Sequence, residues 1–185
     1  NYPDLIQHNI AVVDLGASCT EITMIKNGGI RFTRNVSVGM NQLTQVIQKE
    51  LGITYEETEK FKRRYGLNLA RDGGSLMGNQ VTVTETLVEA IRGGLDSLIL
   101  EIQRSIDFYH IQLRGEKIQR IVFTGGGVLM PGLMSYLSEY FEVETVVDNP
   151  FAHIHYDPVL FGDLAEMAPR FSTAVGLALR PATSL

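Results

Sequence analysis

Two glycine-containing segments, far apart in the sequence, have the composition of turns that hold phosphate. They are residues 14–20, Asp-Leu-Gly-Ala-Ser-Cys-Thr, and residues 124–132, Thr-Gly-Gly-Gly-Val-Leu-Met-Pro-Gly. Each follows an apolar run, so each is expected where a buried strand ends and its backbone amides become unpaired. Unpaired amides on a glycine turn can bind an anion because no side chain blocks its approach. The two turns together suggest one nucleotide held from two sides.

Composition limits the class of protein. Sixteen basic and twenty-one acidic residues give a net charge of −5, which argues against nucleic acid as a partner. A single cysteine excludes an internal disulfide and favours a reducing compartment. No apolar stretch approaches the roughly 20 residues that span a bilayer, so direct membrane insertion is not expected. These features predict a cytoplasmic protein.

The residues around the first turn predict a strand meander followed by two helices. The strands are expected at 10–15, 21–25 and 30–38, with a tight reversal at 27–29. Apolar residues at helical spacing predict a helix over 41–51 that Gly52 ends. Thr54 and Glu57 have the spacing of a capping box for a second helix, which runs to about residue 65.

The second turn is expected within a β-α-β unit. One long helix over 81–113 precedes it, with Gly93 and Gly94 marking a kink or a point of close packing. Strands at 120–123 and 143–147 flank a helix over 131–140, and parallel pairing is the default for such a unit. Residues 68–78 read as a loop, and a final amphipathic helix is expected over 171–179.

This order of elements resembles the second half of the actin-like ATPase superfamily. Met130 occupies the third glycine position of GxGxxG, and no GxxxxGK[ST] phosphate loop is present, so the other common nucleotide motifs do not fit. The resemblance implies an α/β, ribonuclease H-like fold in which a mixed sheet is flanked by helices. Residues 1–40 and 95–185 would form the core subdomain, and residues 41–94 a small inserted helical subdomain.

The resemblance also assigns site residues. Asp14 would act through bound magnesium, the amides of residues 16–18 would meet the β- and γ-phosphates of ATP, and Thr20 would support that turn. Residues 125–127 would approach the adenine and α-phosphate, Pro131 would begin the next helix, and Glu59 with Lys62 would hold the ribose hydroxyls. The cofactor-binding set is therefore Asp14, Gly16, Ala17, Ser18, Thr20, Glu59, Lys62, Gly125, Gly126 and Gly127, with Asp14 as the metal residue. Taken singly, these patterns also occur as plain hairpin turns, packing glycines and an exposed i,i+3 ion pair.

A closer similarity is to the PilM family of type IV pilus assembly proteins. It rests on segments in matching order: residues 31–34, 38–44, 56–62, 101–105, 148–151 and 174–180. The similarity covers about residues 10 to 180 and corresponds to the C-terminal half of the family. It implies a cytoplasmic ATP-binding scaffold whose partners are the PilN cytoplasmic tail and other inner-membrane pilus proteins, with self-association possible.

The half of the family pattern that is not in this sequence matters for activity. It would carry the first phosphate turn and most of the PilN groove, and the start at Asn1 without methionine favours a truncated chain. We therefore expect weak ATP binding and negligible hydrolysis by this chain alone. Two alternatives remain: an FtsA-like division or cytoskeletal protein, and a small-molecule kinase of the same superfamily.

Overall fold

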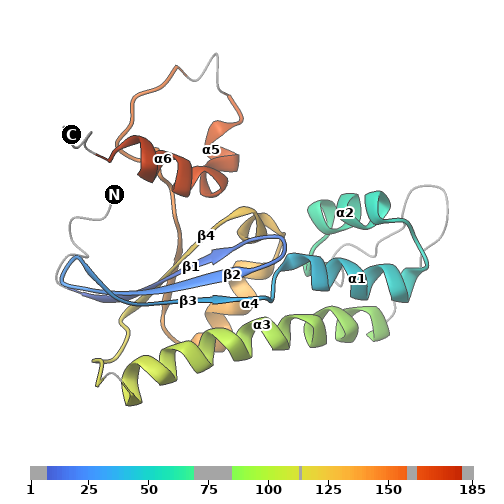
Figure 1. The fold of residues 1–185 in the computed structure, drawn as a ribbon. Coiled ribbons are helices and arrows are strands. Elements are labelled where there is room, and N and C mark those ends of the chain that lie inside the picture. Colours follow the sequence, from blue (N-terminus) through green and yellow to red (C-terminus); the bar gives the residue numbers. More distant parts are fainter. Residues whose placement is uncertain (1–7, 69–84, 113, 158–161, 181–185) are drawn as a thin grey trace.

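A five-stranded mixed sheet forms the centre of the molecule in the computed structural model (Figure 1). The structure describes residues 8–68, 85–112, 114–157 and 162–180. The strands are β1 (Asn9–Leu15), β2 (Thr20–Lys26), β3 (Gly29–Val36), β4 (Arg120–Thr124) and β5 (Glu144–Val147). They lie in the order β3-β2-β1-β4-β5. The first three form the predicted antiparallel meander, and β4 pairs in parallel with both β1 and β5, which confirms the predicted β-α-β pairing.

Two helices cover one face of this sheet. They are α3 (Glu85–Ile111) and α4 (Leu133–Phe141), and their apolar residues join those of β1, β2 and β4 in one buried core. Phe123 of β4 is fully buried and packs against Phe141 of α4, with ring centroids 6.4 Å apart. Alternate residues of β1 point into this core, as period-two strand geometry requires.

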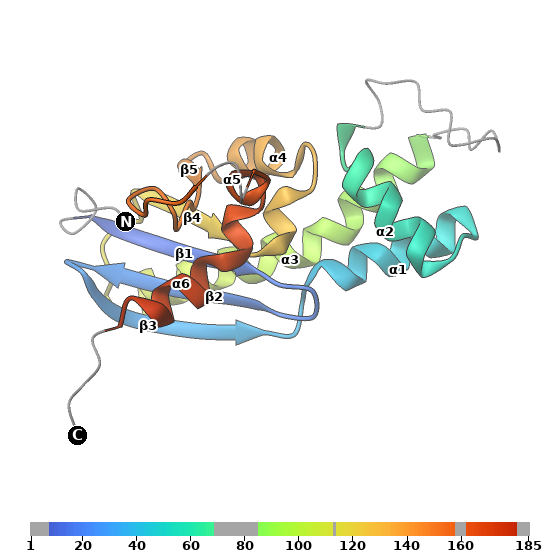
Figure 2. The same ribbon diagram turned by 90° about the horizontal axis from the view of Figure 1, so that it is seen from above.

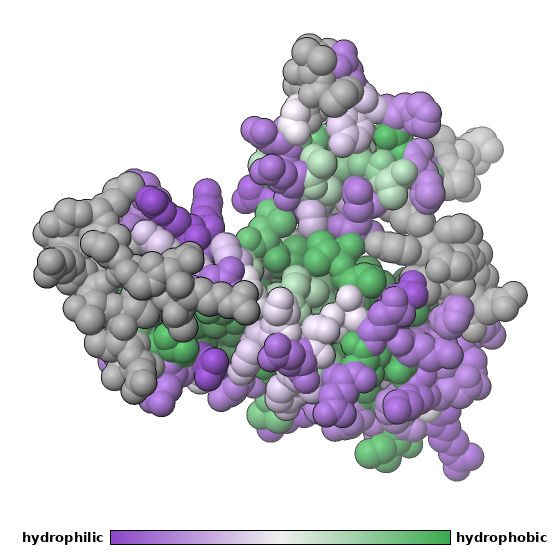
Figure 3. Space-filling model, turned by 180° about the vertical axis from the view of Figure 1, so that it is seen from behind, coloured by the Kyte–Doolittle hydropathy of each residue, from purple (hydrophilic) through white to green (hydrophobic). Residues whose placement is uncertain are grey.

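The opposite face of the sheet carries a thinner layer made by the C-terminal segment (Figure 2). It contains α5 (Leu164–Met167), the 3-10 helix η4 (Ala168–Phe171) and α6 (Ser172–Ala178). Ile10 and Val122 form a small separate cluster on this face. Seen from behind, apolar surface gathers below the C-terminal helices and is surrounded by polar side chains (Figure 3). None of the described helices is long and apolar enough to cross a membrane.

Two short helices lie beyond the end of the sheet, next to the first part of α3 (Figure 1). They are α1 (Met40–Leu51) and α2 (Tyr55–Arg64). Gly52 ends α1 in the left-handed conformation, with φ of 63°, and Thr54 and Glu57 form the reciprocal capping box of α2. Both local predictions are confirmed. The division into a core and an inserted subdomain at residues 41–94 stays a prediction.

Several sequence-based expectations need correction. The helix after β4 begins at Leu133 rather than Pro131, because the 3-10 helix η3 (Gly126–Leu129) and the left-handed Gly132 come first. Pro131 instead accepts a hydrogen bond from the Leu67 amide with its carbonyl. The final helix starts at Ser172 and buries none of its side chains, so it lacks a packed apolar face here. Most of the predicted loop at 68–78 and the start of the predicted long helix lie outside the described residues.

The two adjacent glycines of α3 have different surroundings. A Cβ at Gly93 would meet no atom within 4 Å, whereas one at Gly94 would lie 3.2 Å from Leu43 Cδ1 and 3.5 Å from Val46 Cγ2 of α1. The glycine pair therefore marks close helix packing at Gly94, the second of the two roles that the sequence suggested.

The different surroundings of Gly93 and Gly94 predict that alanine has different effects on stability at the two positions. Gly93→Ala should raise the free energy of unfolding by about 0.5–1 kcal/mol, because alanine restricts the unfolded chain and favours helix. Gly94→Ala should raise the free energy of unfolding by less than Gly93→Ala, or lower it, because the added methyl group would press on Leu43. Urea denaturation of both variants measures the difference. Equal gains would contradict close packing at Gly94.

Candidate functional site

The parallel pairing of β1 and β4 brings the two glycine turns together. Asp14 stands opposite Thr124 in the strand register, so both chains leave the sheet at the same edge. The carboxyl ends of neighbouring parallel strands are where ligands bind in open α/β sheets. The turns that the sequence predicted are thus adjacent in space.

The first turn is held against the start of α1. The Gly16 amide donates to the Cys19 carbonyl at 3.1 Å, and the carbonyls of Gly16 and Ala17 accept from the amides of Met40 and Asn41 at 3.1 and 2.8 Å. These bonds use the Gly16 amide inside the turn. Within the described part of the chain, the amides of Ala17 and Ser18 have no acceptor, so they are the donors open to an anion.

Side chains fix the same turn from both ends. Thr20 is fully buried and donates to the Val38 carbonyl at 2.8 Å, while Asn41 Nδ2 donates to Ser18 Oγ at 3.3 Å. Cys19, in the same turn, is exposed.

The second turn depends on the absence of side chains. Gly125 has φ of 87° and ψ of 172°, a conformation that side chains disfavour, and a Cβ there would collide with Asp14 Oδ1 and the Leu15 carbonyl. A Cβ at Gly127 would lie 2.8 Å from both Leu15 Cβ and Met40 Cγ. Glycine at these positions lets the second turn lie directly on the end of β1.

The C-terminal segment holds this turn in place. The Pro169 carbonyl accepts from the Gly125 amide at 3.0 Å and lies 2.9 Å from Thr124 Oγ1. Ser172 Oγ donates to Asp148 Oδ2 at 2.5 Å and lies 2.6 Å from Thr124 Oγ1. One hydroxyl network thus joins the end of β4, the residue after β5 and the start of α6.

Glu59 and Lys62 of α2 face α1 and form a partly buried hydrogen-bond network with it. Lys62 Nζ donates to Glu59 Oε1 at 2.7 Å, to Thr44 Oγ1 at 2.6 Å and to the Met40 carbonyl at 3.3 Å. Burial raises the pKa of Glu59, but hydrogen bonds from Lys62 and Thr44 and the charges of Lys62 and Arg63 outweigh it, so the pKa lies below its ordinary value. Glu59 is therefore ionised at neutral pH, and its hydrogen bonds with Lys62 and Thr44 join α2 to α1.

Asp14 lies at the base of the site, beneath Gly125. Desolvation by burial raises the pKa of its carboxyl group, and a hydrogen bond from Thr173 of α6 offsets this only in part. A carboxylate held in this way lacks the full hydration that it would have in water, so a nearby cation would stabilise it.

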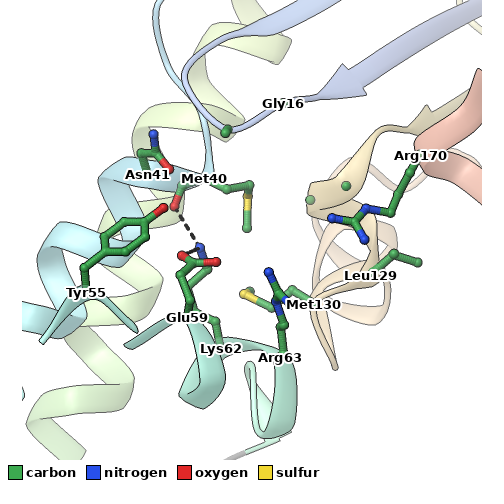
Figure 4. A pocket seen from close by; sticks show the side chains of 13 residues that line it. Gly16, Met40, Asn41, Tyr55, Glu59, Lys62, Arg63, Leu129, Met130 and Arg170 are labelled. Carbon is green, nitrogen blue, oxygen red and sulfur yellow. Dashed lines mark hydrogen bonds and ion pairs between the residues drawn. The ribbon is translucent and has the colours of Figure 1, made fainter. Parts of the chain in front are cut away.

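A cavity of about 340 Å³ opens between the two turns and α2 (Figure 4). Its volume is at the lower end for a small-molecule site, on the order of 300–1,000 Å³. Six of the predicted residues line it: Gly16, Ala17, Glu59, Lys62, Gly126 and Gly127. The other four, Asp14, Ser18, Thr20 and Gly125, belong to the same turns but are not among its lining residues.

Sequence reasoning missed seven lining residues: Met40, Asn41, Tyr55, Arg63, Leu129, Met130 and Arg170. Arg63 directly follows Lys62, and Leu129 and Met130 follow the glycines, so a signal for these three was present. Arg170 had none, because only the fold brings the C-terminal segment to the second turn.

Comparison with known proteins identifies the family. The family described as Type IV pilus assembly protein PilM matches residues 3–182. The chain belongs to the PilM family. The solved structure of a PilM-PilN type IV pilus biogenesis complex is similar, with a TM-score of 0.78 and 27% identity over 96% of this chain and 47% of that one.

More distant relatives share the fold. FtsA of Neisseria meningitidis serogroup B, a cell division protein, is 27% identical over 91% of this chain and 41% of its own length. MreB5 of Spiroplasma citri bound to AMPPNP has a TM-score of 0.57 at 15% identity, which shows the fold alone. The predicted actin-like ATPase fold is confirmed. The chain spans about half the length of the PilM chain and less than half of FtsA.

The crowding at Gly125 gives a testable contrast with Gly52. Both have positive φ, but a Cβ at Gly52 would meet nothing within 4 Å. Gly52→Ala should cost about 1 kcal/mol of unfolding free energy from backbone strain alone. Gly125→Ala should cost clearly more, because the methyl group also displaces Asp14 and Leu15. Equal losses in urea denaturation would mean that the two turns are not in contact.

Proposed function

We propose that this chain is the nucleotide-binding C-terminal half of a cytoplasmic scaffold protein of type IV pilus assembly. The observation that carries the proposal is the cavity lined by both glycine turns and by the Glu59–Lys62 pair, in a chain of the PilM family. The ligand proposed is ATP. The structure of MreB5 with AMPPNP supports this choice, since it shares the fold.

The residues suggest how ATP would lie. The open amides of Ala17 and Ser18 would meet the terminal phosphates, and Gly126 and Gly127 would approach the α-phosphate and the base. Glu59 and Lys62 line the same cavity, and the second carboxylate oxygen of Glu59, Oε2, would contact the ribose hydroxyls while Lys62 holds Glu59 in place. Each contact uses a group that the fold already holds rigidly, so little ordering is needed on binding.

Magnesium fits this arrangement as a companion of the nucleotide. No group of three or more acidic, histidine or cysteine side chains among the described residues could hold a metal ion by itself. Mg²⁺ bound with a nucleotide usually takes one or two carboxylates, phosphate oxygens and water. Asp14, desolvated at the base of the turns, is the carboxylate that would serve it. Bound Mg²⁺ would neutralise phosphate charge.

The proposed output is partner binding rather than rapid turnover. The similar PilM structure was solved with PilN, so we propose a PilN-type cytoplasmic tail as the partner of the intact protein. We place its main groove on the other half of the protein. This chain alone offers one wall of a site, and we expect little or no ATP hydrolysis from it.

A division protein of the FtsA type is the second candidate. FtsA relatives from several bacteria are 24–27% identical to this chain over 91–92% of its residues. Binding of a PilN-type tail, and not of a division protein, would distinguish the first candidate from this one.

Calorimetric titration of Mg-ATP tests the proposal directly. We expect tight binding to a full-length version that includes the N-terminal half, and weak binding to the 185-residue chain. Equal binding to both would mean that this half contains the whole site. No binding to either would contradict a nucleotide role.

Asp14→Asn tests whether Asp14 serves the bound magnesium or only the fold, when Mg-ATP affinity is measured by the same titration. The folded-state pKa of Asp14 is raised, so its ionised form destabilises the empty fold at neutral pH and this cost disappears as pH falls through that pKa. The asparagine variant should therefore have a higher denaturation midpoint than the wild type at pH 7. It should also bind Mg-ATP about tenfold more weakly, or weaker still. Unchanged affinity would remove Asp14 from the site, and a lower midpoint would contradict its unfavourable burial.

A further inference from the structure

Strand β3 leaves one side of the sheet without a partner. It is the outermost strand in the order β3-β2-β1-β4-β5 and covers Gly29–Val36 (Figure 2). Apart from the pairing with β2, no backbone group of β3 bonds to any residue that the structure describes. An edge strand directs about half of its amides and carbonyls away from its neighbour, and these groups can pair with a further strand. The outer side of β3 can therefore accept an extended segment.

A bulge limits where a further strand could pair. The register with β2 shifts between Met24 and Ile25, so that Arg31 has no partner residue on β2. Bulges bend a strand and are one of the devices that protect sheet edges. From Phe32 to Val36 the register is regular, and that length is enough for a short strand. Residues 32–36 are thus the part of the edge that remains available.

The surface beside this edge has an excess of positive charge. β3 contains two arginines, Arg31 and Arg34, and no acidic residue. Arg34 Nη2 and Arg104 Nη1 of α3 both donate to the carboxylate of Glu101, at 2.7 and 2.6 Å. Arg31 forms no ion pair with any described residue. β3 and its ion-pair partners on α3 therefore carry three positive charges and one negative charge, in a protein whose net charge is −5.

An exposed aromatic ring lies on the same side of β3. Phe108 of α3 packs against Phe32, with ring centroids 5.2 Å apart, yet 44% of Phe108 stays exposed. Arg104 precedes Phe108 by about one helical turn, so the two are neighbours on the surface of α3, and 58% of the Arg104 side chain is exposed. A strand paired with residues 32–36 would direct every second side chain toward α3. There those side chains would find an apolar ring and a largely exposed positive charge.

We propose that β3 binds an extended segment of another protein by strand addition, and that this segment carries acidic residues at alternate positions. Main-chain hydrogen bonds to residues 32–36 would supply affinity, and the arginines beside the edge would select acidic side chains. A second copy of this chain is the weaker candidate, because two β3 edges would bring their arginines together and like charges oppose pairing. The described residues that line the candidate cavity include none from β3, so strand addition there does not depend on nucleotide binding.

Two synthetic peptides test the proposal. One alternates threonine with glutamate, and in the other lysine replaces every glutamate. Each is titrated into the ¹⁵N-labelled chain, and hydrogen exchange of the β3 amides is measured by NMR with and without peptide. Arg31→Gln and Arg104→Gln each remove one charge beside the edge. Lys49→Gln is the matched control, because it removes one exposed charge from α1.

We expect the acidic peptide to slow amide exchange within residues 32–36 and the lysine peptide to leave it unchanged. Each arginine variant should weaken binding of the acidic peptide about two- to fivefold, while the Lys49 variant binds it as the wild type does. Binding without protection of these amides would overturn strand addition, because it would indicate attraction to surface charge alone. Absence of binding, or equal binding of both peptides, would also overturn the proposal. Protection without peptide that increases with protein concentration would assign the edge to a second copy instead.

Discussion

The parallel pairing of β1 with β4 is the constraint on which the site depends. It sets Asp14 opposite Thr124, and so brings together two turns that are far apart in the sequence. β1 lies at the middle of the sheet, with β2 on its other side, and its core-facing residues are fully buried. A shift of this register by one residue would turn these apolar side chains to the opposite face. The hydrophobic core therefore fixes the site as well as the fold.

Three further segments are fastened to the joined turns. The start of α1 binds the first turn through Met40 and Asn41, and the C-terminal segment binds the second through Pro169. The segment after α2 reaches the same region, where the Leu67 amide donates to the Pro131 carbonyl. A cavity forms where these segments meet, and its walls come from α1, α2, both turns and η4. A ligand bound there would contact several of these segments at once.

Local chemistry made much of the fold predictable. The strand expected at 21–25, the helix that ends at Gly52 and the capping box of Thr54 and Glu57 each depend on neighbouring residues, and each was confirmed. Pro131 was misplaced because proline suits a helix start in general, whereas here a 3-10 turn and Gly132 come first. The exposure of α6 was not predictable either, since an apolar spacing does not reveal whether a partner surface is present.

The same distinction applies to the site. The glycines and the i,i+3 pair of Glu59 and Lys62 were visible in the sequence, and the resemblance to actin-like proteins suggested their roles. Thr44 as a third member of that pair, and Arg170 beside the second turn, depend on tertiary contacts that no spacing encodes. The internal use of the Gly16 and Gly125 amides also became visible only in the structure.

An NMR titration of the ¹⁵N-labelled chain with Mg-AMPPNP tests the central claim most directly, because amide shifts report weak binding residue by residue. The account predicts shifts at Ala17 and Ser18 in the first turn and at Gly126 and Gly127 in the second, moving with the same apparent affinity. Shifts at one turn alone, or only at residues remote from both, would contradict a single nucleotide held between them.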